Sequence, residues 1–172
     1  NLTCYKTNLI PEFERVGGQA RPAWFLMENV RQAPLPALAG YQFRDQLLNN
    51  RWIGEVQNRM RRFSFGTHEG RALPVQYAAL ENGEWKAAVT AAHGGERKTH
   101  FNSKVGHGVI QRYTVNEALA LQGLPPDFFD HYEPKSPLTQ YGKLKIIAQG
   151  VPLPMGRAIA RAVKKALEAG PR

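Results

Sequence analysis

The sequence has a single cysteine, Cys4, and no long apolar run. One cysteine excludes an internal disulfide and is typical of a reducing compartment, so we expect a cytoplasmic protein. No stretch approaches the roughly 18 apolar residues that a membrane-spanning helix needs, and no signal-peptide pattern opens the chain, so we expect no membrane partner. The five histidines are not spaced like zinc ligands, and we therefore predict no metal site.

Acidic residues are scarce relative to basic ones. The chain has 23 Lys and Arg against 14 Asp and Glu, which gives a formal net charge of +9 and a pI of about 9.9. Residues 51–112 form the most basic block, and four of the five histidines also lie there. This excess favours a polyanionic partner such as nucleic acid, although a well-solvated basic surface would have the same composition.

Hydrophobic spacing and turn residues predict a mixed order of helices and strands. A helix near residues 8–16 leads into an apolar run at 23–27, which is typical of a buried strand of a parallel sheet. After it we predict a helix at 41–48, strands at 52–56 and 61–66, a glycine-rich, loop-rich module at 67–110, and helices at 114–122 and 154–169. The predicted fold class is therefore α/β with a second, small module.

The two C-terminal helices carry the clearest local signals. Thr114 and Glu117 have the spacing of a capping box, in which each side chain satisfies a free backbone N–H, and Gly123 ends that helix. These signals are structural, and a helix that only supports the fold explains them. The last helix has apolar residues at every fourth position, which predict a buried stripe of Met155, Ile159, Val163 and Leu167.

Two short segments contain residue types suited to chemistry. Glu28-Asn29-Val30 follows the first predicted strand, and ligands of α/β sheets bind at strand ends, although a polar strand end facing water is the simpler interpretation. In the second segment, strand alternation would put Gln57, Arg59 and Arg61 on one face. An amide and two guanidinium groups there could bind phosphate or base oxygens, but an exposed edge strand would also explain them.

Four segments, taken in order, resemble the conserved blocks of the DNA cytosine-5 methyltransferases. The chain has Glu-Asn-Val at 28–30, Gln-x-Arg-x-Arg at 57–61, Leu-Gln-Gly-Leu-Pro at 121–125 and Ala-Gln-Gly-Val-Pro at 148–152. The resemblance covers nearly the whole chain outside residues 67–110. Each block alone has low specificity, but four blocks in the family's order are a specific signal.

The resemblance implies a partial Rossmann-like methyltransferase sheet with a small, loop-rich target-recognition module. Residues 1–66 would be the C-terminal part of the catalytic domain, 67–110 the target-recognition region, and 111–172 the returning helices that complete the catalytic domain. The family transfers a methyl group from S-adenosylmethionine to carbon 5 of a cytosine flipped out of double-stranded DNA. The partner would be double-stranded DNA, in a bacterium or phage-infected cell, with restriction–modification as one setting.

The resemblance also implies roles for eight residues. Glu28 matches the glutamate that hydrogen-bonds the cytosine ring N3 and amine, and Arg61 the arginine at the ring carbonyl. Polarising N3 stabilises the charge that builds when a cysteine thiolate adds to carbon 6. Arg59 and Gln57 match residues that brace the pocket. The matched catalytic residues are Glu28, Arg61 and Arg59, the substrate-binding ones Asn29, Gln57 and Arg62, and the cofactor-binding ones Gln149 and Val151.

Two parts of the family pattern are absent from this sequence. There is no Pro-Cys-Gln loop for the nucleophile, and Cys4 lies too close to the first block to match it. The glycine-rich loop for S-adenosylmethionine is also missing, and Gln149 replaces the shorter Asn of the family. We therefore expect a partial enzyme that begins at a processing or truncation point. Two alternatives are a non-catalytic subunit paired with a separate chain that carries the N-terminal half, and a stand-alone DNA-binding module.

Overall fold

The computed structural model describes residues 8–78, 85–90, 113–130 and 138–169, and it is mixed α/β with small sheets. The chain forms two compact units. Unit 1 comprises residues 1–49, 60–76 and 158–172, and unit 2 comprises 50–59 and 77–157. No helix within the described ranges is long and apolar enough to cross a membrane.

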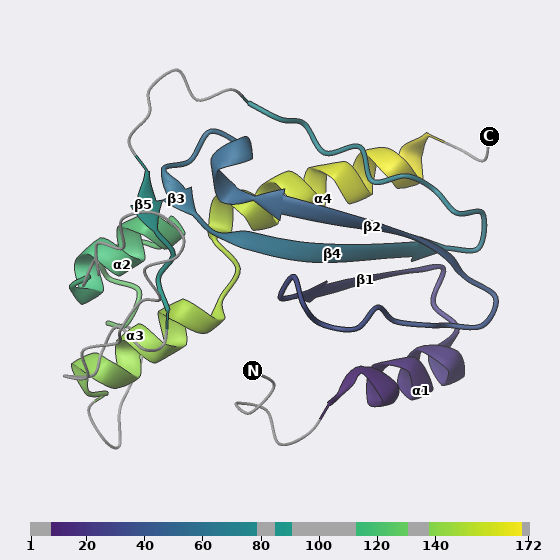
Figure 1. The fold of residues 1–172 in the computed structure, drawn as a ribbon, viewed down its shortest axis with the longest axis horizontal. Helices are drawn as coiled ribbons and strands as arrows, with labels where there is room; N and C mark the ends of the chain where they lie inside the picture. The colour runs from purple at the N-terminus through teal and green to yellow at the C-terminus, as the bar shows by residue number, and fades with distance from the viewer. Residues whose placement is uncertain (1–7, 79–84, 91–112, 131–137, 170–172) are drawn as a thin grey trace, which may run out of the picture. The chain divides into compact units, whose positions relative to one another are not determined.

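Unit 1 is built on a three-stranded sheet. Its strands are β1 (Trp24–Asn29), β4 (Met60–Thr67) and β2 (Gln42–Asn49), and β4 lies in the middle, antiparallel to both neighbours (Figure 1). Two sequence predictions were wrong here. The apolar run at 23–27 forms part of an antiparallel sheet, because a short run shows burial but not the direction of its neighbour. Residues 41–48 form strand β2 rather than a helix, because pairing with β4 overrides the local pattern.

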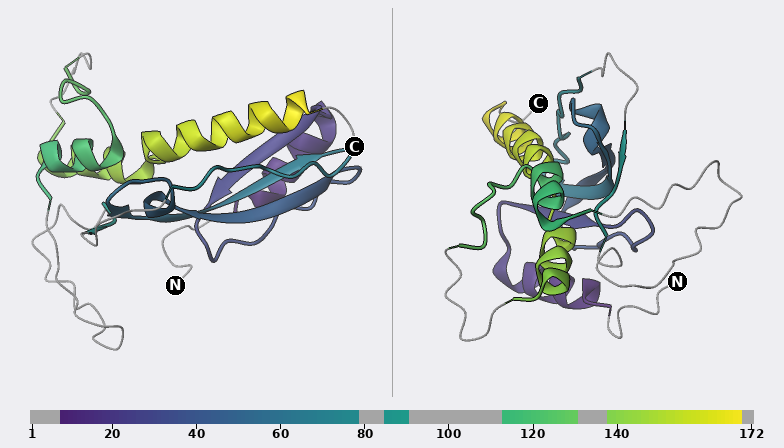
Figure 2. Two further views of the ribbon diagram at one scale, coloured as in Figure 1. Left: turned by 90° about the horizontal axis from the view of Figure 1, so that it is seen from above. Right: turned by 90° about the vertical axis from the view of Figure 1, so that its left-hand side faces the viewer.

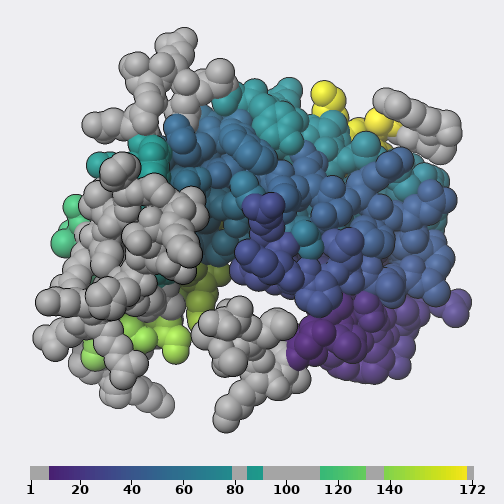
Figure 3. All heavy atoms as spheres, in the orientation of Figure 1, coloured from purple at the N-terminus to yellow at the C-terminus, as the bar shows by residue number. Residues whose placement is uncertain are grey.

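Helix α1 (Ile10–Ala20) packs against the sheet. It confirms the helix predicted near residues 8–16, although it begins and ends a few residues later in the sequence. The rings of Phe13 and Phe25 meet edge to face, with centroids 5.7 Å apart. The backbone N–H of Ala37 donates to a Glu14 carboxylate oxygen at 2.7 Å. Figure 3 shows the atoms of α1 directly against those of the residues that follow β1. Gly66 of β4 permits this packing, because a Cβ there would lie 2.1 Å from the Phe25 ring.

Helix α4 (Leu153–Glu168) confirms the predicted C-terminal helix, and its residues from Ala158 on belong to unit 1. They run alongside the sheet strands (Figure 2). The apolar stripe is buried at Ile159 and Val163, and Leu167 is half-buried. Arg71 donates to the carbonyl oxygens of Ala166 and Leu167 at 3.2 and 2.9 Å. A cation therefore satisfies the carbonyls at the C-terminal end of this helix.

The described residues of unit 2 form three short elements and two helices, and they include the first turn of α4. The 3-10 helix η2 (Asn50–Trp52) precedes β3 (Gln57–Asn58), which pairs in parallel with β5 (Lys86–Ala87). The predicted strand at 52–56 was wrong, because the chain turns at Gly54, whose φ is +96°. The helices are α2 (Val115–Gln122) and α3 (Gln140–Gln149), the latter not predicted from the sequence.

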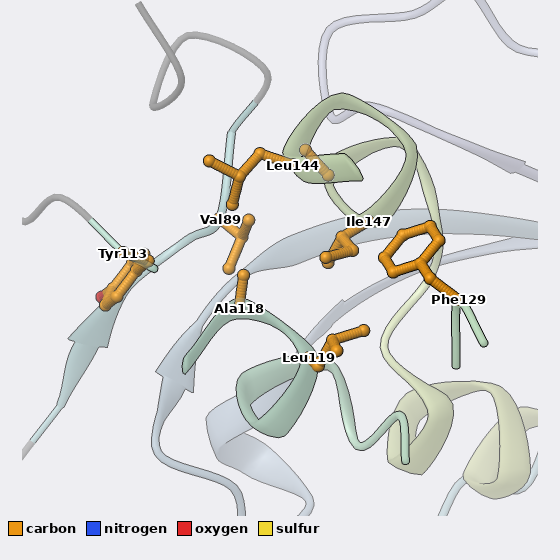
Figure 4. Close-up of a cluster of buried hydrophobic side chains, with 8 residues drawn as sticks. Val89, Tyr113, Ala118, Leu119, Phe129, Leu144 and Ile147 are labelled. Atoms are coloured by element: carbon orange, nitrogen blue, oxygen red, sulfur yellow. The ribbon is translucent and has the colours of Figure 1, made fainter. Parts of the chain in front are cut away.

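The core of unit 2 lies between α2, α3 and the segment after β5 (Figure 4). Tyr113 donates its hydroxyl hydrogen to the carbonyl oxygen of Ala87 at 2.9 Å, and burial raises the pKa of this tyrosine. The buried cluster consists of Val89, Tyr113, Ala118, Leu119, Phe129, Leu144, Ile147 and Ala148. Most of the predicted module at 67–110 lies outside the described residues, so the module and its bounds stay a prediction.

The capping box of α2 is confirmed. The Thr114 backbone N–H donates to the Glu117 carboxylate at 2.8 Å, and the Glu117 N–H donates to the Thr114 hydroxyl at 3.3 Å. Gly123 ends the helix with φ +69°, and a Cβ there would lie 2.9 Å from Pro154. The predicted start and stop of this helix are thus local features that need no tertiary information.

Acid should weaken the α2 cap. Hydrogen bonds from the backbone and then the side chain of Thr114 hold the pKa of Glu117 below its ordinary value of 4.5. Because the folded-state pKa is the lower one, this contribution is fully present above pH 4.5 and is lost as the pH falls through the folded-state value. Urea midpoints should therefore differ between wild type and Glu117→Gln above pH 4.5, and the difference should shrink below it. A difference that stays constant across this range would contradict the assignment.

Candidate functional site

Glu28 and Arg61 form a direct ion pair in unit 1. Glu28 lies near the end of β1 opposite Phe63, and Arg61 lies two positions from Phe63 on β4, so both side chains leave the same face of the sheet. The Nε of Arg61 is 2.8 Å from a Glu28 carboxylate oxygen, and an Nη1 hydrogen is donated to the carbonyl oxygen of Met60 at 2.9 Å. Their side chains are 32% and 18% exposed, so the pair is anchored in the sheet yet reachable from solvent.

This pair has the chemistry to bind a polar heterocycle. A carboxylate accepts hydrogen bonds, and a protonated carboxyl group can donate one, while guanidinium N–H groups only donate. A planar ring with a donor edge and an acceptor edge could therefore contact both groups at once. The ion pair holds the two groups in register before any ligand arrives, which lowers the entropy cost of ordering them.

Asn29 and Arg62 lie on the opposite face of the sheet. Asn29 on β1 pairs with Arg62 on β4. Because Asn29 directly follows Glu28 and Arg62 directly follows Arg61, strand alternation places their side chains on the face opposite to that of Glu28 and Arg61. Arg62 donates to the carbonyl oxygen of Ala33 at 2.7 Å and pairs with Asp45 at 3.4 Å. The side-chain oxygen of Asn29 accepts from the Val30 N–H at 2.9 Å. The sheet therefore does not bring these two predicted substrate-binding residues together with Glu28 and Arg61.

Gln57 and Arg59 belong to unit 2, and the prediction that they share a strand face with Arg61 was wrong. The strand is interrupted at Arg59, between β3 and β4, where the Arg59 N–H donates to the carbonyl oxygen of Gln57 at 3.0 Å. The interruption separates β3, which pairs with β5, from β4, which pairs with β1 and β2. Alternation in the sequence cannot reveal such a break.

Arg59 is a buried arginine that binds backbone carbonyls. Only 2% of the residue is exposed, and its guanidinium donates to the carbonyl oxygens of Val89, Ala148 and Gly150 at 2.7, 2.7 and 2.9 Å. Two of these carbonyls lie at the C-terminal end of α3, where the helix dipole is negative and a cation is favourable. In the folded chain, this residue joins the end of α3 to the segment that follows β5.

Gln122 reaches the same helix end from α2. Its Nε2 donates to the carbonyl oxygen of Ile147 at 2.8 Å, from a side chain that is 1% exposed. Three of the four family-like blocks thus meet around the end of α3, through Arg59, Gln122 and residues 147–150. The sequence signal for this contact is Gln122 in the third block, a residue for which the sequence predicts no role.

The amide of Gln57 is fully buried, and neither of its polar atoms has a hydrogen-bond partner among the described residues. Replacing it by Met removes a desolvated polar group of similar length, so we expect Gln57→Met to raise the free energy of unfolding by about 1 kcal/mol. The matched control is Gln122→Met, which removes a buried hydrogen bond and should lower it by about 1–3 kcal/mol. Urea unfolding measures both, and equal destabilisation would contradict the distinction.

Gln149 and Val151 frame the turn between α3 and α4. Gln149 is the last residue of α3 and is exposed, while Val151 is half-buried. The intervening Gly150 carbonyl accepts from Arg59. An exposed amide beside an apolar side chain could contact one side of an adenosine-like molecule. The described residues contain no glycine-rich loop that would bind the rest of it. Cys4 lies outside the described residues.

No protein-family model and no curated protein sequence matches this chain. Among solved structures, it is similar to one titled as a structure analysis of the Entamoeba histolytica methyltransferase EhMeth, with a TM-score of 0.57 and 12% identity. The similarity covers 85% of this chain and 63% of that chain. The chain thus spans less than two thirds of the length of that structure and shares its fold over that part.

Proposed function

We propose that this chain is the C-terminal part of a DNA cytosine-5 methyltransferase, with a Rossmann-like sheet that is completed by residues outside it. The observation that carries the proposal is the Glu28–Arg61 pair at 2.8 Å, since the family motifs assign these two residues to neighbouring polar atoms of the cytosine ring. The fold shared with part of a methyltransferase supports methyl transfer in general, and the net charge of +9 supports a nucleic-acid substrate.

In this proposal Glu28 hydrogen-bonds the ring N3 and amine of a flipped cytosine, and Arg61 donates to the ring carbonyl. The hydrogen bonds donated to the ring, by a protonated Glu28 carboxyl to N3 and by Arg61 to the carbonyl, strengthen as negative charge develops on the ring, which is how they lower the barrier. Arg59 would act by holding the end of α3. Asn29 and Arg62, on the opposite face of the sheet, would act on the strand end and on DNA phosphates rather than on the ring. The proposed role of buried Gln57 is to brace the pocket wall.

S-adenosylmethionine would be the methyl donor. We assign Gln149 and Val151 to the binding of S-adenosylmethionine. Gln149 is exposed and Val151 is half-buried, so both can contact a bound molecule. Because the sequence has no glycine-rich loop and no Pro-Cys-Gln loop, the remaining donor contacts and the nucleophile must come from another polypeptide segment. This requirement favours a split or partial enzyme.

A methyl-transfer assay tests the proposal. The purified chain is incubated with labelled S-adenosylmethionine and cytosine-containing duplex DNA, with and without the polypeptide encoded directly upstream. Label on DNA only in the presence of the upstream polypeptide is the expected result. No label in either reaction, together with salt-sensitive DNA binding by the chain, would favour a DNA-binding module instead.

A further inference from the structure

The two outer strands of the unit 1 sheet differ in composition. β1 and β2 lie on either side of β4, so each has one edge of backbone N–H and carbonyl groups that β4 does not bind (Figure 1). β1 begins with four apolar residues, Trp-Phe-Leu-Met, whereas β2 has Arg44 and Asp45 near its middle, and both of these residues are exposed. An open apolar edge is a template for another strand, and exposed charges are one means by which proteins block such pairing.

β1 has none of the features that protect an edge strand. Its register with β4 runs without a bulge from Trp24 to Asn29, and the strand contains no proline, lysine or arginine. Glu28, its one charged residue, forms the ion pair with Arg61 of β4. Among the described residues, β4 is the only element whose backbone pairs with residues 24–27. The outer edge of this apolar stretch is therefore open in the part of the chain that the structure describes.

The burial pattern of β1 resembles that of a strand from the middle of a sheet. Phe25 and Met27, on one face, are only 5% and 9% exposed. On the other face Leu26 is half-buried, and the ring of Trp24 lies 6.2 Å from that of Phe65, centroid to centroid. Apolar residues on both faces are typical of strands with a neighbour on each side. Trp24 nevertheless remains 38% exposed, so a strand paired with β1 would have an apolar side chain to cover.

We propose that the outer edge of β1 binds an extended segment of the upstream polypeptide as a further strand of the sheet. The inference rests on the proposed function and deepens it, because it assigns the surface through which the rest of the enzyme joins this chain. Since β1 contains Glu28, the added strand would also bring residues of the partner beside the Glu28–Arg61 pair.

The shared fold favours this occupant over a second copy of the chain. The similarity to the solved methyltransferase structure covers 63% of that structure, so more than a third of it lies beyond the match. A second copy of this chain would add the same part of the fold again, whereas the upstream polypeptide would add a different part. The open edge of β1 is a place in unit 1 where such a part can continue the sheet.

Hydrogen exchange of individual backbone amides tests this proposal, in the intact chain with and without the upstream polypeptide. Successive residues of a strand direct their N–H groups to opposite edges, so an added strand protects every second residue. We expect the amides at alternate positions of β1 to exchange at least about ten-fold more slowly in the complex, while the amides of β2 stay unchanged.

Two variants compare the two outer strands. Trp24 and Gln42 both pair with Thr67, so they lie at the same level on opposite edges of the sheet. Because a lysine on an edge strand opposes pairing, Trp24→Lys should weaken binding of the upstream polypeptide about ten-fold and remove the added protection. Gln42→Lys is the matched control and should leave both unchanged. Circular dichroism confirms that each variant is folded, and the exchange pattern of the wild-type chain depends on neither variant.

Three results would overturn the proposal. One is the absence of added protection at β1 when the upstream polypeptide is present. Another is added protection at β2 in place of β1. The third is protection at β1 in the chain alone that is lost on dilution, since a second copy would then occupy the edge. The measurement uses neither DNA nor S-adenosylmethionine, so an unpaired edge leaves the Glu28–Arg61 assignment standing, and a failed transfer assay leaves the exchange result interpretable.

Discussion

Replacing Arg59 by Met should destabilise the folded chain by about 3 kcal/mol or more, since each hydrogen bond to a buried charged group contributes about 1.5–3 kcal/mol. The substitution would leave the carbonyls of Val89, Ala148 and Gly150 without their common donor. The hydrogen bonds to Val89 and Ala148 are buried, so water cannot easily replace them, whereas the bond to Gly150 is part-buried. Urea unfolding monitored by tryptophan fluorescence measures the effect.

Two companion variants make the Arg59 result specific. Arg59→Lys keeps the charge but lacks the planar fork that serves three acceptors, so we expect a destabilisation between wild type and Met. Arg15→Met removes an exposed arginine that pairs with Glu12, and it should leave the free energy of unfolding almost unchanged. An unfolding midpoint for Arg59→Met equal to that of Arg15→Met would contradict the bracing role.

Glu28→Gln should lower the rate of methyl transfer by about 100- to 10,000-fold in the complemented enzyme. Gln is isosteric and preserves the packing at the end of β1, but its amide cannot transfer a proton to ring N3 as a carboxyl group can. The pair with Arg61 is partly exposed, and Gln can still accept a hydrogen bond from Arg61, so the change should cost about 1 kcal/mol of stability. The variant should therefore fold and bind DNA while transfer fails.

The matched control for Glu28→Gln is Glu12→Gln. Glu12 lies on α1 and pairs with Arg15 at 2.6 Å at an exposed position, so the same chemical change there should leave transfer rates intact. Measuring kcat and DNA affinity for both variants separates a catalytic role from a binding role. Wild-type transfer by Glu28→Gln would remove Glu28 from the reaction.

Local signals predicted local structure well. The capping box of Thr114 and Glu117 and the glycine stop at Gly123 involve neighbours in the sequence, and they appear in the structure as predicted. The stripe on α4 follows from helical periodicity alone. Strand β2 was missed because its pairing with β4 joins residues far apart in the sequence, and its own pattern also fits a helix.

The candidate site was predictable only in part, because its contacts also join residues that are far apart in the sequence. Glu28 and Arg61 are 33 positions apart, and the resemblance to a family suggested a common role before any pairing was known. The partners of Arg59 could not be predicted, because they are backbone carbonyls 30, 89 and 91 positions away and carry no side-chain signal. Alternation wrongly united Arg59 with Arg61, since it assumes an unbroken strand.

The identity of the methylated nucleoside tests the central claim most directly. Duplex DNA is incubated with labelled S-adenosylmethionine, this chain and the upstream polypeptide, then digested to nucleosides and separated. Our account predicts label in 5-methylcytosine, and its loss when Glu28→Gln replaces the wild-type chain. Label in N4-methylcytosine or N6-methyladenine, or in 5-methylcytosine at the wild-type level with Glu28→Gln, would contradict it.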